Sequence, residues 1–287
     1  MTRVAVLVPC HDDGALVEEA VHSVDEEEPV EIVVVDDCST DPATLAALDR
    51  LRGEGVRVLR HDRNEGVPAA RMTALGATSA PFVFPLDADD VLFPGSLAAM
   101  ADRLDAEPDA AVCFGDYEEF GAQETIRSVP EEIDPFRVAY SNDWGAPLFR
   151  RSALVQLGGW LPEGQDSRTF PYEDWHVWMS LAEHGARGVH AGRGVVTYRR
   201  RIQPGRRLSL DRSRHAAAYR LLRQLHPQLF AQLGAHRRRS PLGRLQKLLY
   251  PVVYGRRPRF GFEQRLRFAL DRLGVGPDAL LGRRRSS

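Results

Sequence analysis

The stretch that decides the fold is FVFPLDADDVLFPG, which runs from Phe82 to Gly95. Four of its first five residues are apolar, as in a buried strand, and Asp87, Asp89 and Asp90 follow almost at once. Like charges this close repel one another, so the cluster is costly unless a cation neutralises it. The stretch therefore predicts a buried strand that ends in a cation site, although Asp at strand ends also occurs as ordinary turn chemistry.

The same strand pattern is repeated up to Tyr117, with helical patterns between the strands. Short apolar runs predict further strands at residues 4–9, 31–37, 56–61 and 110–117. Apolar residues at helical spacing predict helices at residues 15–24, 41–51, 66–78 and 94–107. Such alternation implies parallel strands with right-handed crossovers, so the sequence predicts an α/β fold with a Rossmann-like, mostly parallel central sheet flanked by helices.

The pattern becomes less regular after Tyr117. We expect a loop at residues 118–136, a strand followed by a helix at 144–159, a helix at 172–185 and a last strand at 194–201. Beyond Leu210 the chain predicts helical stretches broken by four prolines, namely Pro227, Pro241, Pro251 and Pro258. The chain is thereby divided into an α/β part at residues 1–201 and a helical C-terminal extension at residues 202–287.

Charge separates nearly the same two parts. The chain of 287 residues has a formal net charge of −2, but from Arg199 onward it carries 23 Arg and Lys against four Asp and Glu, a net charge of +19. The residues before Arg199 carry 15 basic and 36 acidic side chains, a net charge of −21. The acidic body opposes binding of the whole chain to a nucleic-acid backbone. The tail at residues 242–270 interleaves Arg with Leu, Phe and Tyr, as membrane-interface segments do.

Cysteine usage and hydropathy indicate the compartment. Three cysteines, at residues 10, 38 and 113, form no CxxC pair, which favours a reducing environment. The N-terminal apolar run is too short for a signal peptide, and no stretch approaches the roughly 18 apolar residues of a membrane span. We therefore expect a cytosolic protein that is soluble or peripheral at the inner membrane face. The tail either binds an anionic membrane surface or packs as a helical subdomain on the catalytic part.

Acids follow three of the predicted strands: Asp12 and Asp13 the first, Asp36 and Asp37 the second, and the Asp87 cluster the fourth. Parallel strands present their carboxyl ends at one edge of the sheet, where open α/β sheets bind ligands. Carboxylate oxygens suit Mg²⁺ or Mn²⁺, usually shared with substrate phosphates. The sequence therefore predicts a divalent cation at this edge.

Three other enzyme classes lack their signatures. A nucleotidyltransferase needs a Gly-rich loop with Arg and Lys after the first strand, and PCHDDGA at residues 9–15 has none. An NAD-dependent oxidoreductase would show GxGxxG at the same turn. A haloacid-dehalogenase-like phosphatase carries its DxD pair after the first strand, whereas here the pair follows the fourth strand. These classes are therefore disfavoured.

Six segments occur in the order of a known family: VLVPCHDDGALVEEAVHSV, EIVVVDDCSTD, NEGVPAARMTAL, FVFPLDADDVLFPGSL, LFRRSALVQLGGW and YEDWHVWMSLAEHGA. Together they resemble an inverting glycosyltransferase of family 2 with the GT-A fold, over roughly residues 3–201. The Arg-rich tail matches no pattern of that family. The resemblance implies a bacterial enzyme that moves a sugar from a nucleotide-sugar, with UDP expected, to a hydroxyl of a glycan, lipid-linked or secondary-metabolite acceptor, as in polysaccharide and cell-envelope biosynthesis.

The resemblance implies a donor site in residues 1–116. Asp37 corresponds to the acid that accepts the uracil N–H, and Arg71 to the arginine that reaches the donor diphosphate. For Arg71, a solvated helix face is the alternative. Asp87 is expected to contact the ribose and Asp89 to bind the Mn²⁺ or Mg²⁺ ion. The other expected nucleotide-sugar contacts are Pro9, His11, Asp13 and Ala88.

The resemblance implies an acceptor half in residues 117–201. Asp174 corresponds to the general base that takes the proton of the attacking hydroxyl, with Glu173 beside it. Both acids fall in the first turn of a predicted helix, where they also occur merely as stabilisers of the helix dipole. Trp144 and Trp175 are expected to stack on acceptor sugar rings, although a single Trp is usually part of a core. The alternative function is a nucleic-acid- or membrane-binding protein that uses the basic tail and has a degenerate nucleotide-binding domain.

Overall fold

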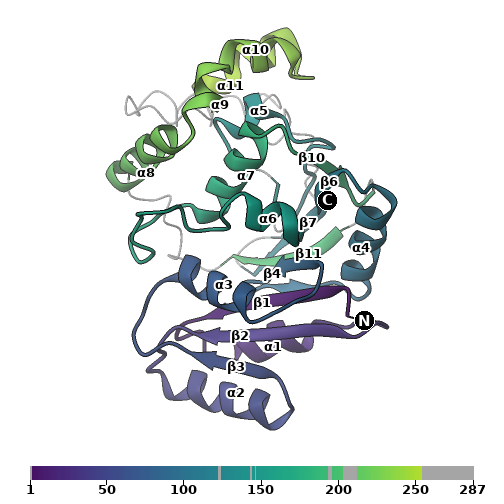
Figure 1. Cartoon of the computed structure of the whole chain (residues 1–287), viewed down its shortest axis with the longest axis vertical. Helices are drawn as coiled ribbons and strands as arrows, with labels where there is room; N and C mark the ends of the chain where they lie inside the picture. Colours follow the sequence, from purple (N-terminus) through teal and green to yellow (C-terminus); the bar gives the residue numbers. More distant parts are fainter. Residues whose placement is uncertain are drawn as a thin grey trace.

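The computed structural model describes residues 2–121, 124–142, 144–145, 147–192, 196–202 and 212–253. Its centre is a seven-stranded sheet (Figure 1), in the spatial order β10 (Arg187–His190), β6 (Ala110–Phe114), β9 (Leu148–Arg150), β4 (Phe82–Pro85), β1 (Val4–Cys10), β2 (Val30–Asp36) and β3 (Arg57–Arg60). Every strand except β9 runs in the same direction, and β9 lies antiparallel between β4 and β6. The predicted α/β fold with a mostly parallel sheet is confirmed.

The apolar runs become strands because both faces of the sheet are covered. All residues of β1, β4 and β6 are buried. The helices between these strands are α1 (Leu16–His22), α2 (Pro42–Gly53), α3 (Val67–Gly76) and α4 (Ser96–Ala106). Right-handed crossovers place α1 and α2 on one face and α3 on the other. The carboxyl ends of β1, β2 and β4 therefore meet at one edge, as the sequence predicts.

The predicted loop at residues 118–136 is wrong. This stretch contains most of β7 (Asp116–Gly121), together with β8 (Thr125–Arg127) and the short helix α5 (Pro135–Val138). With β5 (Val91–Leu92) and β11 (Val196–Ile202), β7 and β8 form a second sheet in the order β5-β11-β7-β8. The acids of β7 hid the strand from a hydropathy argument, because they pair across the sheet with arginines of β8 and β11, Arg127–Glu119 at 2.6 Å and Arg199–Glu118 at 2.7 Å.

The second half of the chain is mainly helical. After α6 (Arg151–Gln156) and α7 (Glu173–Glu183) come four C-terminal helices, α8 (Arg212–Leu225), α9 (Pro227–Ala231), α10 (Leu233–Arg239) and α11 (Arg244–Val253). Figure 1 shows these four helices at the end of the molecule opposite α2. Tyr219, Leu222 and Leu229 are buried in the same hydrophobic core as the central sheet, so α8 and α9 are integrated with the α/β part.

The prolines of the extension act less uniformly than predicted. Pro227 opens α9 and Pro241 separates α10 from α11, but Pro251 lies inside α11. Pro251 is the eighth of the ten residues of α11, and the helix ends two residues after it. Pro258 and the basic stretch at residues 254–270 lie outside the described residues. Within the described ranges, no helix has both the length and the apolar character that crossing a bilayer requires.

Candidate functional site

A cavity of about 60 Å³ lies where β4 ends, α7 begins and β11 passes. Its charged and polar lining combines residues from both halves of the chain, namely Arg71, Asp87, Asp90, Asn142, Asp174, Tyr198 and Arg200. The expected diphosphate arginine, the DxD region and the expected base therefore come together, although Arg71 and Asp174 are more than a hundred positions apart in the sequence. Asn142 belongs to this site and was not predicted, whereas Arg200 lies in the YRRR stretch that ends the last predicted strand.

Arg71 connects the two halves of the site. One terminal nitrogen donates to Asp87 Oδ1 at 2.5 Å and the other to Glu173 Oε1 at 3.0 Å. The side chain is only 6% exposed, which rules out the solvated helix face as an alternative. Burial lowers the pKa of the guanidinium, but Asp87, Glu173 and Asp174 outweigh burial and raise that pKa. Arg71 is therefore a permanent cation inside a set of carboxylates.

Two buried polar atoms of the lining have no hydrogen-bond partner among the residues that the structure describes. They are Nε of Arg71, a donor, and Oδ1 of Asn142, an acceptor. The orientation of Asn142 follows from its other contact, because its Nδ2 donates to Asp174 Oδ2 at 2.6 Å and a carboxylate only accepts. Such atoms are costly unless a ligand satisfies them, so the cavity is suited to a polar ligand.

The two acids that begin α7 differ in their surroundings. Asp174 is exposed, and its Oδ1 accepts the backbone N–H of Trp175 at 2.7 Å. Glu173 is 20% exposed, and burial raises its pKa to about 7, an effect that Arg71 opposes and Asp174 strengthens. Glu173 is therefore partly buried against Arg71, whereas Asp174 is exposed at the cavity.

Asp90 lies buried among other acids at the β4 end. It is 7% exposed, and burial raises its pKa well above the usual range, with further contributions from Asp87 and Asp89. The backbone N–H of Arg201, at 2.8 Å from Asp90 Oδ1, and the charge of Arg200 oppose this shift. A bound cation would relieve the repulsion among these carboxylates.

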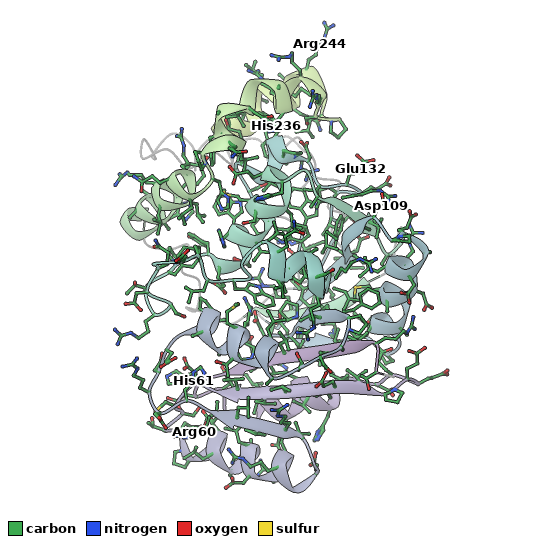
Figure 2. All side chains as sticks on the ribbon, viewed as in Figure 1. Arg60, His61, Asp109, Glu132, His236 and Arg244 are labelled. Atoms are coloured by element: carbon green, nitrogen blue, oxygen red, sulfur yellow. The ribbon has the colours of Figure 1, made fainter. Side chains whose placement is uncertain are left out.

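The β2 acids are, in contrast, held by the surrounding chain. Asp36 is fully buried, pairs with Arg60 and accepts the backbone N–H of Ser39 at 2.8 Å. Asp37 is 3% exposed and accepts from the backbone of Glu65 at 2.8 Å and of Gly66 at 2.6 Å. Asp37 also accepts from Nδ1 of His61 at 2.7 Å, and Figure 2 shows Arg60 and His61 side by side. These two bases were not predicted, because nothing in the local sequence of β3 marks them as partners of β2.

Gly66 is required at this point of the loop. Its φ is 88°, a conformation that L side chains rarely adopt. A Cβ added there would lie 2.8 Å from the backbone oxygen of Ser167. The hydroxyl of Ser167 in turn accepts from the N–H of Ala69 at 2.8 Å. Gly66 thus lets the loop that Asp37 anchors lie directly against residues 167–168.

The residues that follow β1 contact the chain that follows β2. They do not line the 60 Å³ cavity. Asp12 Oδ1 accepts the backbone N–H groups of Thr40 at 2.7 Å and Asp41 at 2.8 Å, which lower the pKa of Asp12. Asp13 accepts the N–H of His11 at 2.9 Å. The His11 side chain is 41% exposed. Two further expected donor contacts are buried, Pro9 within β1 and Ala88 beyond β4.

Left-handed backbone conformations in residues other than glycine occur next to these groups. Among the described residues they are Asp12 (φ 54°), Cys38 (φ 64°) and Tyr172 (φ 58°). Asp12 follows β1, Cys38 follows Asp37, and Tyr172 precedes Glu173. Such conformations are strained and are found preferentially at functional sites. They mark the carboxyl edge of the sheet and the start of α7.

The expectation that Trp144 and Trp175 stack on acceptor sugars does not agree with their burial. Trp144 is fully buried against Trp178, with ring centroids 5.5 Å apart. Trp175 is 3% exposed, donates to Val138 O at 2.7 Å and stacks on Tyr219. Both indoles are core residues, because each ring is already covered by another aromatic ring.

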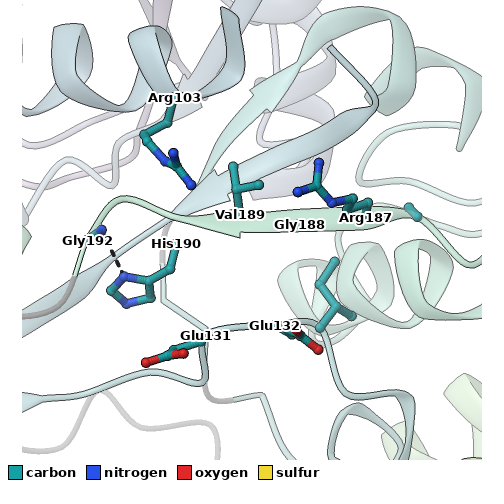
Figure 3. Close-up of a pocket in the computed structure, with 10 residues that line it drawn as sticks. Arg103, Glu131, Glu132, Arg187, Gly188, Val189, His190 and Gly192 are labelled. Carbon is teal, nitrogen blue, oxygen red and sulfur yellow. Dashed lines mark hydrogen bonds between the residues drawn. The ribbon is translucent and has the colours of Figure 1, made fainter. Parts of the chain in front are cut away.

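A larger cavity, of about 590 Å³, lies elsewhere, beside the edge strand β10. Figure 3 shows Arg103 and Arg187 on one side of it and Glu131 and Glu132 on the other. Arg187 is already paired with Asp109 at 2.7 Å. This cavity contains none of the residues that the chemistry of the β4 end requires, so the smaller cavity is the candidate site.

The arrangement is chemically suited to a diphosphate ester next to a nucleophile. Within the described ranges, no group of three or more His, Cys, Asp or Glu is placed to hold a metal ion by itself. The clustered carboxylates at the β4 end nevertheless fit a cation that takes one or two protein ligands and completes its coordination with phosphate oxygens and water.

Comparison with known proteins agrees with this geometry. The family model described as "Glycosyl transferase family 2" matches residues 5–157. The succinoglycan biosynthesis protein ExoO of Rhizobium meliloti (strain 1021) is 44% identical over 79 residues, which are 27% of this chain and 22% of that protein. The succinoglycan biosynthesis protein ExoU of the same organism is 36% identical over 101 residues, 34% of this chain and 30% of that protein. The matches thus span less than a third of the length of these curated relatives.

Solved structures show the same fold. The structure of S. aureus TarS 1-349 in complex with UDP-GlcNAc superposes with a TM-score of 0.64 at 19% identity, over 98% of this chain and 83% of that chain. The complex of TarS 1-349 with UDP gives a TM-score of 0.63 at 19% identity, over 98% and 82% of the two chains. The GT-A architecture is thereby confirmed. Because the family model covers more than half of the chain, the protein belongs to glycosyl transferase family 2 and is a glycosyltransferase.

Proposed function

We propose that this enzyme moves a sugar, with inversion, from a UDP-sugar to a hydroxyl of a glycan or lipid-linked glycan. The observation that carries the proposal is Arg71, a buried cation with an unpartnered Nε that contacts Asp87 of the donor half and Glu173 of the acceptor half. The UDP complexes of TarS and the succinoglycan names of ExoO and ExoU support this choice of donor and acceptor class. Because these acids and the arginine are in place, a degenerate nucleotide-binding domain is disfavoured.

The donor is proposed to lie across the carboxyl edge of the sheet, in residues 1–116. We expect the uracil to contact Pro9, His11, Asp13 and Asp37. The ribose and the diphosphate are expected to contact Asp87, Ala88 and Arg71. Asp37 has three of its four acceptor positions filled, which leaves one at Oδ2. Its main role is therefore to order the loop from His61 to Gly66, with one position left for an imide N–H.

A divalent cation, Mn²⁺ or Mg²⁺, is proposed at Asp89, with Asp87 and Asp90 nearby. When bound, such an ion neutralises the charge that develops on the leaving UDP. Arg71 contributes in the same direction, because its free Nε is a donor that a phosphate oxygen satisfies. In this proposal Arg71 binds the diphosphate. The acids at the β4 end attract the divalent ion.

Asp174 is proposed as the general base. It is exposed at the cavity, and Asn142 holds one of its carboxylate oxygens at 2.6 Å. Asn142 Oδ1, which is free of partners among the described residues, is placed to accept from the acceptor hydroxyl or a neighbouring one. Glu173 is engaged with Arg71 and partly protonated, so it is less suited to take the proton.

The test of this function is a binding and turnover panel with the purified full chain. UDP-, GDP- and dTDP-sugars are titrated with and without Mn²⁺, and release of the nucleoside diphosphate is followed. We expect Mn²⁺-dependent binding of one UDP-sugar and inversion at its anomeric carbon. Undiminished binding and transfer in excess EDTA, or preference for another nucleotide, would contradict the assignment.

The second partner that we propose is an anionic membrane surface. Leu245 and Leu248 are 66% and 59% exposed on α11, next to a basic cluster that comprises Arg237, Arg238, Arg239, Arg244 and Lys247. The other face of α11 is fixed, because Tyr250 shares a 2.6 Å hydrogen bond with Ser141. Exposed leucines flanked by cations suit the interface of an anionic bilayer. Figure 2 shows Arg244 and His236 far from Arg60 and His61 at the nucleotide end.

Vesicle binding tests this surface. The full chain is expected to bind phosphatidylglycerol vesicles in preference to phosphatidylcholine vesicles, with affinity that falls as salt rises. The variant with Leu245→Gln and Leu248→Gln should bind several-fold more weakly. Equal binding to both lipids, or a dimer that these substitutions dissociate, would contradict the membrane assignment.

A further inference from the structure

The helix that carries the proposed base is held at both ends by C-terminal helices. α7 begins with Glu173 and Asp174, and Tyr172 precedes it with φ 58° and ψ 46°. An aromatic residue in this left-handed region is strained and needs its surroundings to hold it. What holds Tyr172 thereby also holds the backbone from which both acids project.

The first end of α7 is held by α8. The Tyr172 hydroxyl shares a hydrogen bond with Nδ1 of His215, whose ring is 5% exposed and lies edge-on to Tyr172 at 5.2 Å. One helical turn further along α8, Tyr219 stacks on Trp175 with centroids 5.6 Å apart and planes at 24°. The Tyr219 hydroxyl donates to Ala139 O at 2.8 Å. Residues on both sides of the two acids are thus fixed by one helix.

The other end of α7 is held by α9. Glu183 accepts the backbone N–H of Gln228 at 2.7 Å, and its second oxygen pairs with His226 Nδ1 at 2.9 Å. His226 Nε2 lies 2.9 Å from Nδ1 of His176 on α7. Burial lowers the pKa of His226, and it lowers the pKa of His176 to about 3, with His226 adding to the shift. His176 is therefore neutral at ordinary pH, and the contacts of Glu183 and His226 hold this end of α7 against α9.

We propose that His215 and Tyr219 are positioning residues for the transfer reaction. They act through Tyr172 and Trp175 to fix the first turn of α7, and they touch neither donor nor acceptor. The proposal rests on the proposed role of Asp174. A displacement of about 1 Å in a catalytic group can cost about a hundredfold in rate, so a looser first turn should lower kcat by about tenfold or more. The catalytic unit accordingly extends beyond residue 201 into α8 and α9.

The competing explanation is that Tyr172 and His215 only contribute to packing and stability. A double-mutant cycle distinguishes this explanation from a positioning role. Tyr172→Phe, His215→Phe and the double variant are compared for kcat, with UDP-glucose and UDP-GlcNAc as donors, and for the Kd of UDP. We expect each single variant to lose about tenfold in kcat at unchanged Kd, and the double variant to lose no more. Additive losses, or single variants with wild-type kcat, would overturn the proposal.

Two further comparisons remove the effect of lost stability. Leu222→Ala, at a fully buried position of α8, lowers stability without removing the contacts to Tyr172 and Trp175, and should keep kcat. Tyr219→Phe retains the stacked ring and should keep most of kcat, whereas Tyr219→Leu should lose it. If Leu222→Ala lost kcat as strongly as His215→Phe, the effect would be general destabilisation and the proposal would fail.

Hydrogen exchange gives a readout that needs no turnover. The His176 amide donates to Tyr172 O at 2.9 Å in the first turn of α7, and the His184 amide donates to Ser180 O at 3.1 Å beyond its end. His215→Phe should accelerate exchange at the first amide at least tenfold and leave the second unchanged. Equal exchange at both would overturn the proposal. Retained turnover in Asp174→Asn, by contrast, would contradict the proposed base and not the positioning contacts themselves.

Discussion

The acids at the end of β2 and those at the end of β4 look alike in the sequence and differ in the structure. Asp36 and Asp37 are compensated by Arg60, His61 and backbone amides. Asp90 is buried beside other acids, and burial together with the charges of Asp87 and Asp89 raises its pKa. The comparison teaches that residue type at a strand end does not distinguish an acid that holds the chain together from one that lies buried among like charges.

The comparison extends to the start of α7, where Asp174 is left exposed for a ligand. Asp174→Asn should lower kcat by about 10²–10⁴-fold, because an amide cannot take the acceptor proton. Donor Kd should stay near wild type, since the base faces the acceptor. Single-turnover transfer and UDP calorimetry measure the two quantities. Glu173→Gln is the control in the same helical turn, and its kcat should fall less. Wild-type turnover in Asp174→Asn would show that Asp174 only stabilises its helix.

At the β4 end, Asp89→Ala should weaken Mn²⁺-dependent donor binding by about a hundredfold, since a proposed metal ligand is lost. Its free energy of unfolding should hardly change or should rise, because one of the repelling carboxylates is removed. Calorimetry with and without Mn²⁺ and urea denaturation check both statements. A large loss of stability with unchanged Mn²⁺ dependence of donor binding would show that Asp89 has a structural role, like Asp36 and Asp37.

At the β2 end, Asp37→Asn should lower the free energy of unfolding by about 2 kcal/mol, because one acceptor oxygen becomes a donor that faces a backbone N–H. UDP and UDP-sugar affinities should fall together, since the ordered loop serves the nucleotide end. Urea denaturation and calorimetry test this prediction. An unchanged unfolding midpoint would show that the buried contacts of Asp37 contribute little.

Glu173 gives the smallest expected effect, a dependence of stability on pH. Burial raises its pKa from 4.5 to about 7 in the folded protein, so the folded state holds the proton more tightly than the unfolded chain. The contribution to stability is full below pH 4.5 and is lost as the pH rises to about 7. In Glu173→Gln this pH-dependent loss of stability should disappear, because the amide does not titrate. Urea denaturation at several pH values between 4.5 and 7.5 measures the difference.

Much of the fold could be predicted from local sequence. β1, β2 and β4 are apolar runs because both faces of the sheet are covered, and α2 shows its start through Asp41 and Pro42. The hairpin of β7 and β8 could not be predicted in this way, because its polar side chains are compensated across strands. Strand β10 is only four residues long and contains Arg187 and Gly188, so its pattern resembles a turn.

The candidate site was only partly visible in the sequence. The acids and Arg71 stand in motifs, and family resemblance identified them. Asn142 has no motif and joins the site only through the fold. His215 and Tyr219 were hidden for a different reason, because the sequence left open whether the extension binds a membrane or packs on the catalytic part, and no motif marks these two residues. Trp144 and Trp175 show the reverse error, since residue type alone does not distinguish a core indole from an exposed one.

Arg71 has a consequence for the order of events in a reaction cycle. Its guanidinium is shared between Asp87 and Glu173, so a diphosphate that competes for it alters the charge balance beside Asp174. Before the donor arrives, Glu173 is tied through Arg71 to the donor half, next to Asp174. We therefore expect an ordered sequential mechanism in which the donor binds first. The acceptor site would then bind its ligand well only after the nucleotide-sugar has bound. An enzyme without a donor would therefore bind little acceptor.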